Sequence, residues 1–522
     1  MKRSLSAGML LALLLSTAAW AQSQRIEGVP VHAPGNPILA DGRYYSADPA
    51  PFVFDGKLWI LAGRDEAPAD VNDFIMKEWQ LLVTNNPKSG NWVHYPAVVR
   101  PEDVFKWATP GRAYAGQVVK GPDGRLYFYA PVHQASSTAK DKFAIGVAVA
   151  DSPTGPWVDA HPSGPIVSQQ VPEPNHIQNI DPTVLVDDDG RVYLYWGTFG
   201  QLRGVELERD MVTPKGRVVK VDSLTGFFEA PWLMKRSGIY YMLYAGNQAG
   251  PNSDCTPAIY HACIAYGTAS SPLGPWTYRG IVLKPVSSTT SHPGAVPFNG
   301  QWYLAYHTAD AKGGGHFRRS VAVDRLEFDD SQSPPAIRLL TPTRRPQPVP
   351  LPTRNIAGRA TAAASNEPIP VKYWIKSLND GITKPAPLPP DMWGSWTPDN
   401  PSHQWIEYRW DQPVTINGSR IWFWADQPTG SDTRIAPPKQ WQLFYWNAGW
   451  KPILSPERYG TKPGKFQDVR FPPITTRCLR AVLTASGNDG NRAGLAVQEW
   501  EVLAPEVQAP RPPGGQPAPS CE

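Results

Sequence analysis

Three acidic residues stand in apolar or proline-containing segments that resemble one another along the chain. Glu229 lies in FFEAPWLMKRSG, Asp48 opens DPAPFVFDG and Asp181 opens DPTVLVDDDG. A half-buried carboxyl without a counter-ion is costly and has a raised pKa, which is the property that a general acid needs near neutral pH. The alternative for Glu229 is a structural role, either exposed to solvent or paired with Lys235 or Arg236.

The three acids belong to a sequence pattern that occurs five times: an apolar segment, a turn containing glycine and an aromatic-rich strand. The turn glycines, about 50 to 70 residues apart, are Gly56, Gly124, Gly190, Gly238 and Gly300. Asp-Gly, Ser-Gly and Asn-Gly between apolar runs are typical of β-hairpins, and each interval has room for four strands. The repeat predicts an all-β chain with a five-bladed β-propeller over residues 36–330.

The first residues of the five copies are predicted to meet, because the first strand of every propeller blade lines the central channel. These positions hold Asp48, Tyr114, Asp181, Glu229 and His292. Four of the five side chains are a carboxylic acid or an imidazole, although a blade scaffold alone does not need polar groups there. The pattern favours a catalytic cluster over its alternatives, a solvated ring of polar groups or an ion-binding plug.

The ordered set of motifs resembles glycoside hydrolase family 43. The resemblance covers about 300 residues and rests on NPILADGRYYSADPAP, NIDPTVLVDDDGRVYLYWG, FFEAPWLMKRSGIYYMLYA, HPGAVPFNGQWYLAYHT and HFRRSVAVDRL. It implies Asp48 as general base, Asp181 as the residue that orients the acid and adjusts its pKa, and Glu229 as general acid of an inverting mechanism. The chain departs from the family at Tyr114, where tryptophan is frequent.

Other candidate residues have two interpretations each. His292 either helps to hold a calcium ion in the channel, as the resemblance implies, or is a neutral imidazole beneath the sugar. Arg319, rather than Arg318, is the predicted contact to sugar hydroxyls or to a carboxylate. Trp107 is either a platform for sugar stacking or a core residue, and Phe228 is expected at the substrate. No cofactor is expected to be required, and calcium is the one ion considered.

Beyond the propeller the composition changes twice. Residues 331–356 are rich in proline and predict a strap that closes against the propeller and then links onward. Residues 357–505 alternate apolar and polar side chains and resemble a discoidin-like, galactose-binding-like β-sandwich (jelly roll), which either binds carbohydrate or is structural. Residues 506–522 are predicted to be a disordered tail.

Composition limits the location and the partners. Residues 1–21 have the basic start, apolar run and small-residue site of a secretory signal, followed by a short segment at 22–35, so a secreted or periplasmic protein is expected. A net charge of +4 gives no reason to expect a nucleic-acid partner, and no later segment is apolar enough to span a membrane. Of the four cysteines, Cys255 and Cys263 are close enough in sequence to form a disulfide.

Together these features predict a monomeric, exo-acting α-L-arabinofuranosidase or β-D-xylosidase that acts on plant hemicellulose or its oligosaccharides. An endo-arabinanase is the alternative within enzymes, and a propeller lectin without catalysis is the alternative outside them. Loop residues set the sugar and the linkage, and the fold alone does not decide them.

Overall fold

The computed structural model describes residues 27–247, 255, 262–286, 290–343, 355–365, 375–387, 391–396, 401–455, 459–488, 490–505 and 521. The predicted signal peptide and nearly all of the predicted tail lie outside this range. Within it, no helix is long and apolar enough to cross a membrane.

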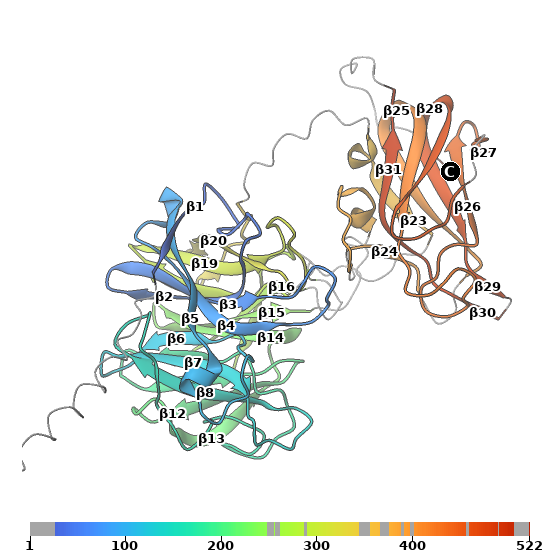
Figure 1. The fold of residues 1–522 in the computed structure, drawn as a ribbon. Helices are drawn as coiled ribbons and strands as arrows, with labels where there is room; N and C mark the ends of the chain where they lie inside the picture. Colours follow the sequence, from blue (N-terminus) through green and yellow to red (C-terminus); the bar gives the residue numbers. More distant parts are fainter. Residues whose placement is uncertain are drawn as a thin grey trace, which may run out of the picture.

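The first part of the chain forms five antiparallel sheets, coloured blue through yellow in Figure 1. The blades contain, in order, β1 (Val29–His32) to β5, β6 to β9, β10 to β13, β14 to β17 and β18 to β20. The other strands are β2 (Tyr45–Phe54), β3 (Lys57–Asp65), β4 (Met76–Thr84), β5 (Asn91–Val99), β6 (Gln117–Lys120), β7 (Leu126–His133), β8 (Phe143–Ala150), β9 (Val158–Asp159), β10 (Thr183–Val186), β11 (Val192–Trp196), β12 (Leu202–Leu207), β13 (Pro214–Val221), β14 (Phe227–Arg236), β15 (Ile239–Gly246), β16 (Cys263–Ala269), β17 (Thr277–Leu283), β18 (Gly294–Phe298), β19 (Gln301–Thr308) and β20 (Ser320–Leu326). The predicted five-bladed propeller is confirmed, and its first blade already begins at Val29, before the expected boundary at residue 36.

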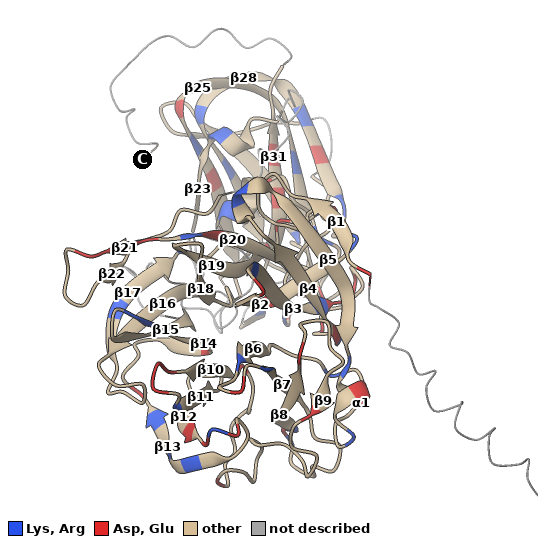
Figure 2. Ribbon diagram, turned by 90° about the vertical axis from the view of Figure 1, so that its left-hand side faces the viewer, with Lys and Arg blue, Asp and Glu red and all other residues tan. Residues whose placement is uncertain are grey.

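The first long strand of each blade lies innermost. Figure 2 shows β2, β6, β10, β14 and β18 around the centre of the propeller. The hairpins behind them have the predicted chemistry: Asp55 and Gly56 both have positive φ (49° and 65°), as do Ser237 and Gly238 (51° and 77°). Two positive φ values in a two-residue loop are the mark of a type I′ turn, whose twist matches that of the strands.

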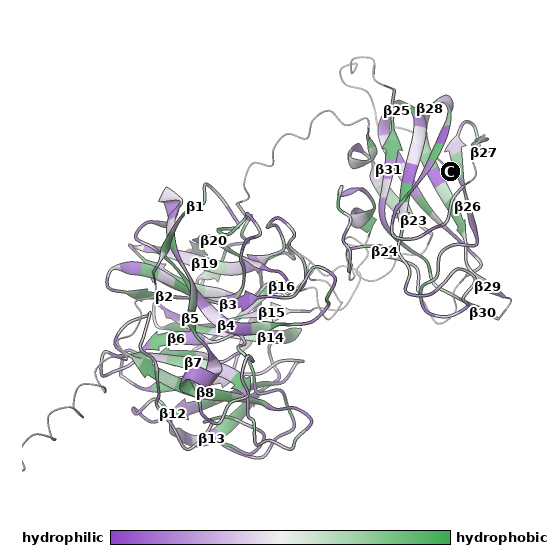
Figure 3. Cartoon of the chain, in the orientation of Figure 1, coloured by the Kyte–Doolittle hydropathy of each residue, from purple (hydrophilic) through white to green (hydrophobic). Residues whose placement is uncertain are grey.

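Apolar side chains fill the space between the blades, and Figure 3 shows hydrophobic residues concentrated in the strands. Buried tryptophans also connect neighbouring sheets through their indole N–H groups. Trp79 in β4 donates to the carbonyl of Tyr114 at 2.7 Å, and Trp232 in β14 donates to the carbonyl of Ala295 at 2.8 Å. A buried indole N–H needs such a partner, so these contacts fix the blades against one another as well as burying area.

The ring is closed by polar side chains where the N-terminal segment meets the last blade. Ile38 donates its N–H to the carbonyl of Val321, and the Asn36 side chain both accepts from Val323 N–H and donates to Asp324. Thr343, from the segment that follows the propeller, also bonds Asp324. The buried carboxylate of Asp324 therefore binds both the start of the propeller, through Asn36, and the strap, through Thr343.

The strap packs on the propeller, as its prolines suggest. Strand β22 (Ala336–Ile337) pairs with β21 (Phe328–Asp329), and the Leu340 N–H donates to the carbonyl of Val282. The short helices found within the described residues are η1 (Pro87–Ser89), α1 (Pro101–Val104), η2 (Ala357–Arg359) and η3 (Ser377–Asn379).

The second domain is a β-sandwich built on two long strands, β25 (His403–Phe423) and β28 (Phe466–Thr484), drawn in orange in Figure 1. The remaining strands are β23 (Thr361–Ala364), β24 (Trp393–Gly394), β26 (Gln440–Trp446), β27 (Trp450–Pro452), β29 (Gly487–Asn488), β30 (Asn491–Arg492) and β31 (Ala496–Leu503). One end of β25 pairs with β23 and the other end with β31, so the two halves of β25 belong to different layers of the sandwich. The second domain has a hydrophobic core separate from that of the propeller.

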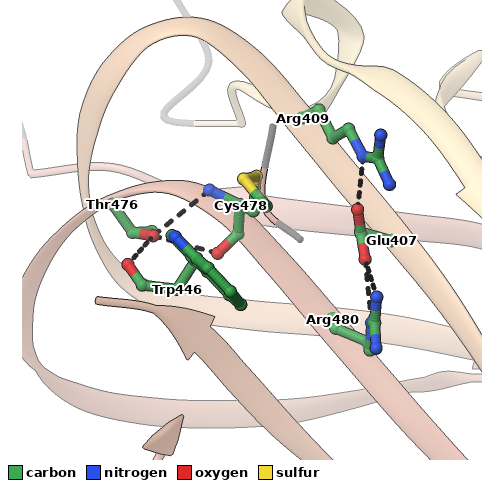
Figure 4. The surroundings of a disulfide bond; sticks show 7 residues. Glu407, Arg409, Trp446, Thr476, Cys478 and Arg480 are labelled. Carbon is green, nitrogen blue, oxygen red and sulfur yellow. Dashed lines mark hydrogen bonds and ion pairs between the residues drawn. A yellow bond between two sulfur atoms is a disulfide. The ribbon is translucent and has the colours of Figure 1, made fainter. Parts of the chain in front are cut away.

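Two disulfides occur among the described residues. Cys255 is bonded to Cys263, as its spacing suggests, and Cys478 to Cys521, a pair that the sequence left open. Near Cys478, Figure 4 shows the buried Glu407 between Arg409 and Arg480. Two cations at one buried carboxylate satisfy a charge that would otherwise be costly on this sheet face.

Candidate active site

The inner ends of the blades enclose a cavity of about 250 Å³. It contains all three predicted acids, contributed by different blades. Its walls are mainly aromatic and polar; the residues that line it are Asp48, Phe74, Met76, Tyr114, Ala115, Phe143, Gln178, Ile180, Asp181, Thr198, Phe199, Phe228, Glu229, Thr290, His292, His316 and Arg319. A cavity of this size with a few convergent polar groups is suited to one small sugar unit.

Asp48 is buried and paired with cations and hydrogen-bond donors. Arg319 donates from Nη1 to its carboxylate at 2.7 Å and holds Asp65 through two further side-chain bonds of 2.9 Å each. Burial opposes ionisation of Asp48, but the positive charge of the Arg319 guanidinium outweighs it and holds the pKa of Asp48 well below its usual value. A buried partner, rather than solvent, therefore keeps this carboxyl ionised.

Two histidines stand beside Asp48. The Asp48 N–H donates to Nδ1 of His307 at 3.0 Å, and Nε2 of the same ring hydrogen-bonds the carbonyl of Thr290, which fixes Nε2 as the protonated nitrogen. His292 Nδ1 lies 3.5 Å from the Asp48 carboxylate. Burial lowers the pKa of His292 to about 4 and lowers that of His307 as well, so both rings are neutral near pH 7.

Glu229 and Asp181 form a coupled pair of carboxyls. Thr198 Oγ1 donates to Glu229 Oε2 at 2.8 Å, and the Ala230 N–H donates to Asp181 Oδ2 at 3.2 Å. Burial is the main cause that raises the pKa of both groups, and the Glu229 charge raises the pKa of Asp181 further. Because this repulsion is mutual, the pair retains its last proton to a higher pH than an isolated carboxyl does.

Irregular backbone places these acids. Asp48 and Asp181 have φ of 53° and 56°, and Ala230, next to Glu229, has φ of 57°. The pairing of β2 shifts register between Ala47 and Ala50, and that of β14 shifts after Glu229. Such bulges re-aim side chains, and positive φ in non-glycine residues is a strain found at functional sites. The structural equivalent of Asp48 in β14 is thus Ala230, one residue after Glu229.

Of the remaining predicted site residues, four line the cavity and one does not. Tyr114, Phe228, His292 and Arg319 line the cavity. Trp107 does not: its ring packs on Phe105 with a centroid separation of 5.3 Å, and its indole donates to Asp159 at 3.2 Å. The ring is partly buried against the propeller core, which favours the core interpretation, and the stacking platform stays a prediction.

The structural alternative for Glu229 also fails on geometry. Lys235 pairs with Asp187 and Asp188, and Arg236 pairs with Asp330 at 2.6 Å. Both cations are thus engaged at the far end of β14, where they neutralise other acids. Glu229 lies in the cavity with hydroxyl groups as its partners.

Comparison with known proteins agrees with this geometry. The family model for glycosyl hydrolases family 43 matches residues 80–334. A xylosidase/arabinosidase of Bacteroides ovatus is 31% identical over 335 residues, which cover 55% of this chain and 92% of the relative. The chain belongs to glycoside hydrolase family 43. It is therefore a glycosidase, and the matched residues lie in the propeller.

Further relatives of this family 43 enzyme carry related names. A β-xylosidase of Xylanibacter ruminicola is 30% identical, covering 55% of this chain and 94% of the relative. An arabinoxylan arabinofuranohydrolase of Bacillus subtilis is also 30% identical, covering 56% and 61%. A solved family 43 β-xylosidase/α-arabinofuranosidase from a compost metagenome is 28% identical, covers 60% of this chain and 98% of its own, and has a TM-score of 0.49.

Several residues in or beside the cavity of the family 43 enzyme were not predicted from the sequence. Asp65 and His307 stand at or near the ends of second strands, one strand away from the repeat positions, and Thr198, Phe199 and Thr290 lie in connecting segments. Asp65 ends β3, two residues beyond the first copy of the repeat, and His307 belongs to the YHT of the fifth, so a comparison of second-strand ends could have found these two. The loop residues have no repeating signal.

The protein groups around His292 do not by themselves supply a full set of calcium ligands, and the channel ion stays a prediction. Calcium takes six to eight oxygen ligands, whereas His292 offers an imidazole and its neighbour Asp48 is already bound by Arg319. Throughout the described part of the chain, no group of three or more His, Cys, Asp or Glu side chains could hold a metal ion. The cluster at this position is an ion-pair network of protein groups.

Replacing Arg319 with Gln is expected to destabilise the enzyme by about 3–5 kcal/mol, because Asp48 and Asp65 would remain buried without their cation. The acid limb of its kcat/KM profile should also move to higher pH. Urea unfolding and pH–rate profiles test both. Arg325→Gln, on strand β20 that begins just after Arg319, is the control, since its exposed pair with Glu327 is worth at most about 1 kcal/mol. Equal losses in the two variants would contradict the assignment.

Proposed function

We propose that this family 43 enzyme is an exo-acting, inverting glycosidase that removes terminal α-L-arabinofuranosyl or β-D-xylosyl residues from plant hemicellulose or its oligosaccharides. One observation carries the proposal: a carboxylate kept ionised, Asp48, and a carboxyl with a raised pKa, Glu229, face one small cavity. The names of the relatives, which mention xylosidase and arabinofuranohydrolase activities, support this choice of sugars.

The reaction follows from these two groups. The C1–O bond of the terminal sugar breaks while Glu229 transfers its proton to the leaving oxygen. Water attacks C1 from the opposite face, its oxygen bonds to C1, and its proton passes to Asp48. Asp181 keeps the proton of the acid in place through its negative charge, and Arg319 keeps the base ionised. Inversion of configuration at C1 results.

The proposal is tested with aryl α-L-arabinofuranosides, aryl β-D-xylosides and linear arabinan. Proton NMR of the first product identifies the anomer, and product length shows the mode of attack. Release of single sugars of inverted configuration is expected. Retained configuration would exclude the inverting step, long products from arabinan would favour an endo-arabinanase, and sugar binding without turnover would favour a lectin.

The pH profile follows from the two opposite pKa shifts. Because the pKa of Asp48 is lowered, Asp48 stays ionised at the ordinary pKa of an aspartate, and kcat/KM should keep its plateau down to about pH 4. Because the pKa of the Glu229 and Asp181 pair is raised, activity is lost at high pH, when the acid ionises. Asp181→Asn should move this basic limb to lower pH. A basic limb unchanged in this variant would show that Asp181 does not adjust the acid.

We further propose that hydrolysis needs no bound metal, because carboxyl groups of the chain supply both proton transfers. Treatment with EDTA followed by dialysis should change kcat by less than about twofold, well below the hundredfold or greater effect of a lost acid or base. A tenfold loss that added calcium restores would contradict this. Thermal unfolding with and without calcium separates a stabilising ion from a catalytic one.

Export is also proposed. The two disulfides fit an oxidising compartment, and the signal-like start of the chain is consistent with it. N-terminal sequencing of protein from the periplasm or medium should begin at Gln22.

A further inference from the structure

One aromatic ring at the cavity is unusually exposed. Phe199, between β11 and β12, keeps 49% of its surface accessible and has a φ of 50°. A bulky residue at positive φ is strained, and its exposed surface gains nothing from burial. A loop selected for stability alone would place glycine or asparagine here. The ring at this position therefore points to contact with a ligand.

The turn that carries Phe199 is held in place. Gly197 donates its N–H to the carbonyl of Ile180 at 2.8 Å, and Gly200 donates to the carbonyl of Phe228 at 3.1 Å. A Cβ on Gly197 would lie 1.9 Å from a backbone oxygen, so only glycine fits. The Phe199 ring packs edge to face on Phe228, with centroids 5.4 Å apart and planes at 83°. Its orientation is therefore set before any sugar binds.

This ring lies on the same side of the cavity as the acid. Thr198, the residue before Phe199, donates its hydroxyl to Glu229 Oε2 at 2.8 Å. In the proposed reaction Glu229 protonates the oxygen of the leaving group, so the leaving sugar must lie next to this carboxyl. A sugar held there meets Phe199 at the mouth of the cavity.

We propose that Phe199 forms the subsite for the leaving group and stacks against a pyranose ring, specifically a β-D-xylopyranosyl unit. The inference rests on the proposed function. A pyranose chair presents a flat face of C–H groups to an aromatic ring, and xylose carries no hydroxymethyl group to obstruct either face. The terminal sugar occupies the inner cavity, and the xylosyl leaving group covers the exposed ring.

The test compares substrates that differ only in the leaving group. Xylobiose and arabinofuranosyl-xylobiose have a xylosyl leaving group, whereas β-D-xylosyl fluoride and α-L-arabinofuranosyl fluoride have none to stack. The ratio of kcat/KM for oligosaccharide over fluoride should fall about tenfold in Phe199→Ala, as expected for one lost aromatic contact. Phe199→Trp should keep the ratio within about threefold. The control Val158→Ala, at an exposed site on β9, should leave it unchanged.

Each outcome decides the inference. A falling ratio in Phe199→Ala, restored by tryptophan, supports the subsite. An unchanged ratio overturns it, whether both rates stay the same or fall together, since a joint loss would mean that Phe199 acts on Glu229 or on the inner sugar. If wild-type enzyme hydrolyses neither fluorides nor oligosaccharides, the proposed function fails instead, and this result is distinct from the loss of a single subsite.

Discussion

Replacing Glu229 with Gln should lower kcat/KM for xylo-oligosaccharides about 10³-fold while the protein stays folded. The amide cannot deliver a proton to the leaving oxygen, and general acid catalysis contributes about 10²- to 10⁴-fold. Its shape is nearly that of the acid, so Thr198 retains a partner at this position. The loss should shrink for dinitrophenyl glycosides, whose leaving groups depart without a proton.

The measurement is a series of kcat values against leaving-group pKa for wild type and variant. Glu208→Gln, an exposed acid of the neighbouring blade, serves as the control. Unfolding curves establish that the variant retains its fold. If Glu229→Gln hydrolyses oligosaccharides at the wild-type rate, Glu229 is structural and the proton donor must be sought elsewhere in the cavity.

Replacing Asp48 with Asn should lower kcat about 10³-fold for every substrate, good leaving groups included. The base acts on water rather than on the leaving oxygen, so its loss does not depend on the leaving-group pKa. Asparagine tolerates positive φ, so the backbone at 53° is preserved. Asp65 remains to hold Arg319. This independence from the leaving group distinguishes the base from the acid.

Asp55→Asn is the matched control, because Asp55 lies on the same blade, is exposed and has a similar φ of 49°. It should have wild-type kinetics. An Asp48→Asn variant whose activity returns with activated substrates would reverse the two roles. Wild-type products of retained configuration would show that Asp48 is a nucleophile instead.

The propeller was predictable because its signals are local. Type I′ turns need residues that tolerate positive φ, so the Asp-Gly, Ser-Gly and Asn-Gly pairs mark hairpins wherever they separate apolar runs. Repetition of the pattern then indicates the number of blades. The edge strand β1 of the first blade, which pairs with β5, was not predicted because no turn signal of this kind marks it.

The site was predictable in part for the same reason. Asp48, Asp181 and His292 each precede proline at the start of an inner strand, so the repeat itself brings them together. Glu229 was found despite an offset of one residue, which the bulge in β14 absorbs. Trp107 shows the limit, since a tryptophan near a glycine-rich loop has the same local sequence whether it faces a sugar or the core.

The amino-acid sequence determined the blade count, the three acids and the family, because turn chemistry and alternation act between residues close along the chain. The tertiary structure decided what these acids can do. Arg319 is 271 residues from Asp48, yet its guanidinium keeps that carboxyl ionised, whereas burial raises the pKa of Glu229. Electrostatic energies depend on distances in space and on burial, and neither quantity follows from which residues are adjacent in the sequence.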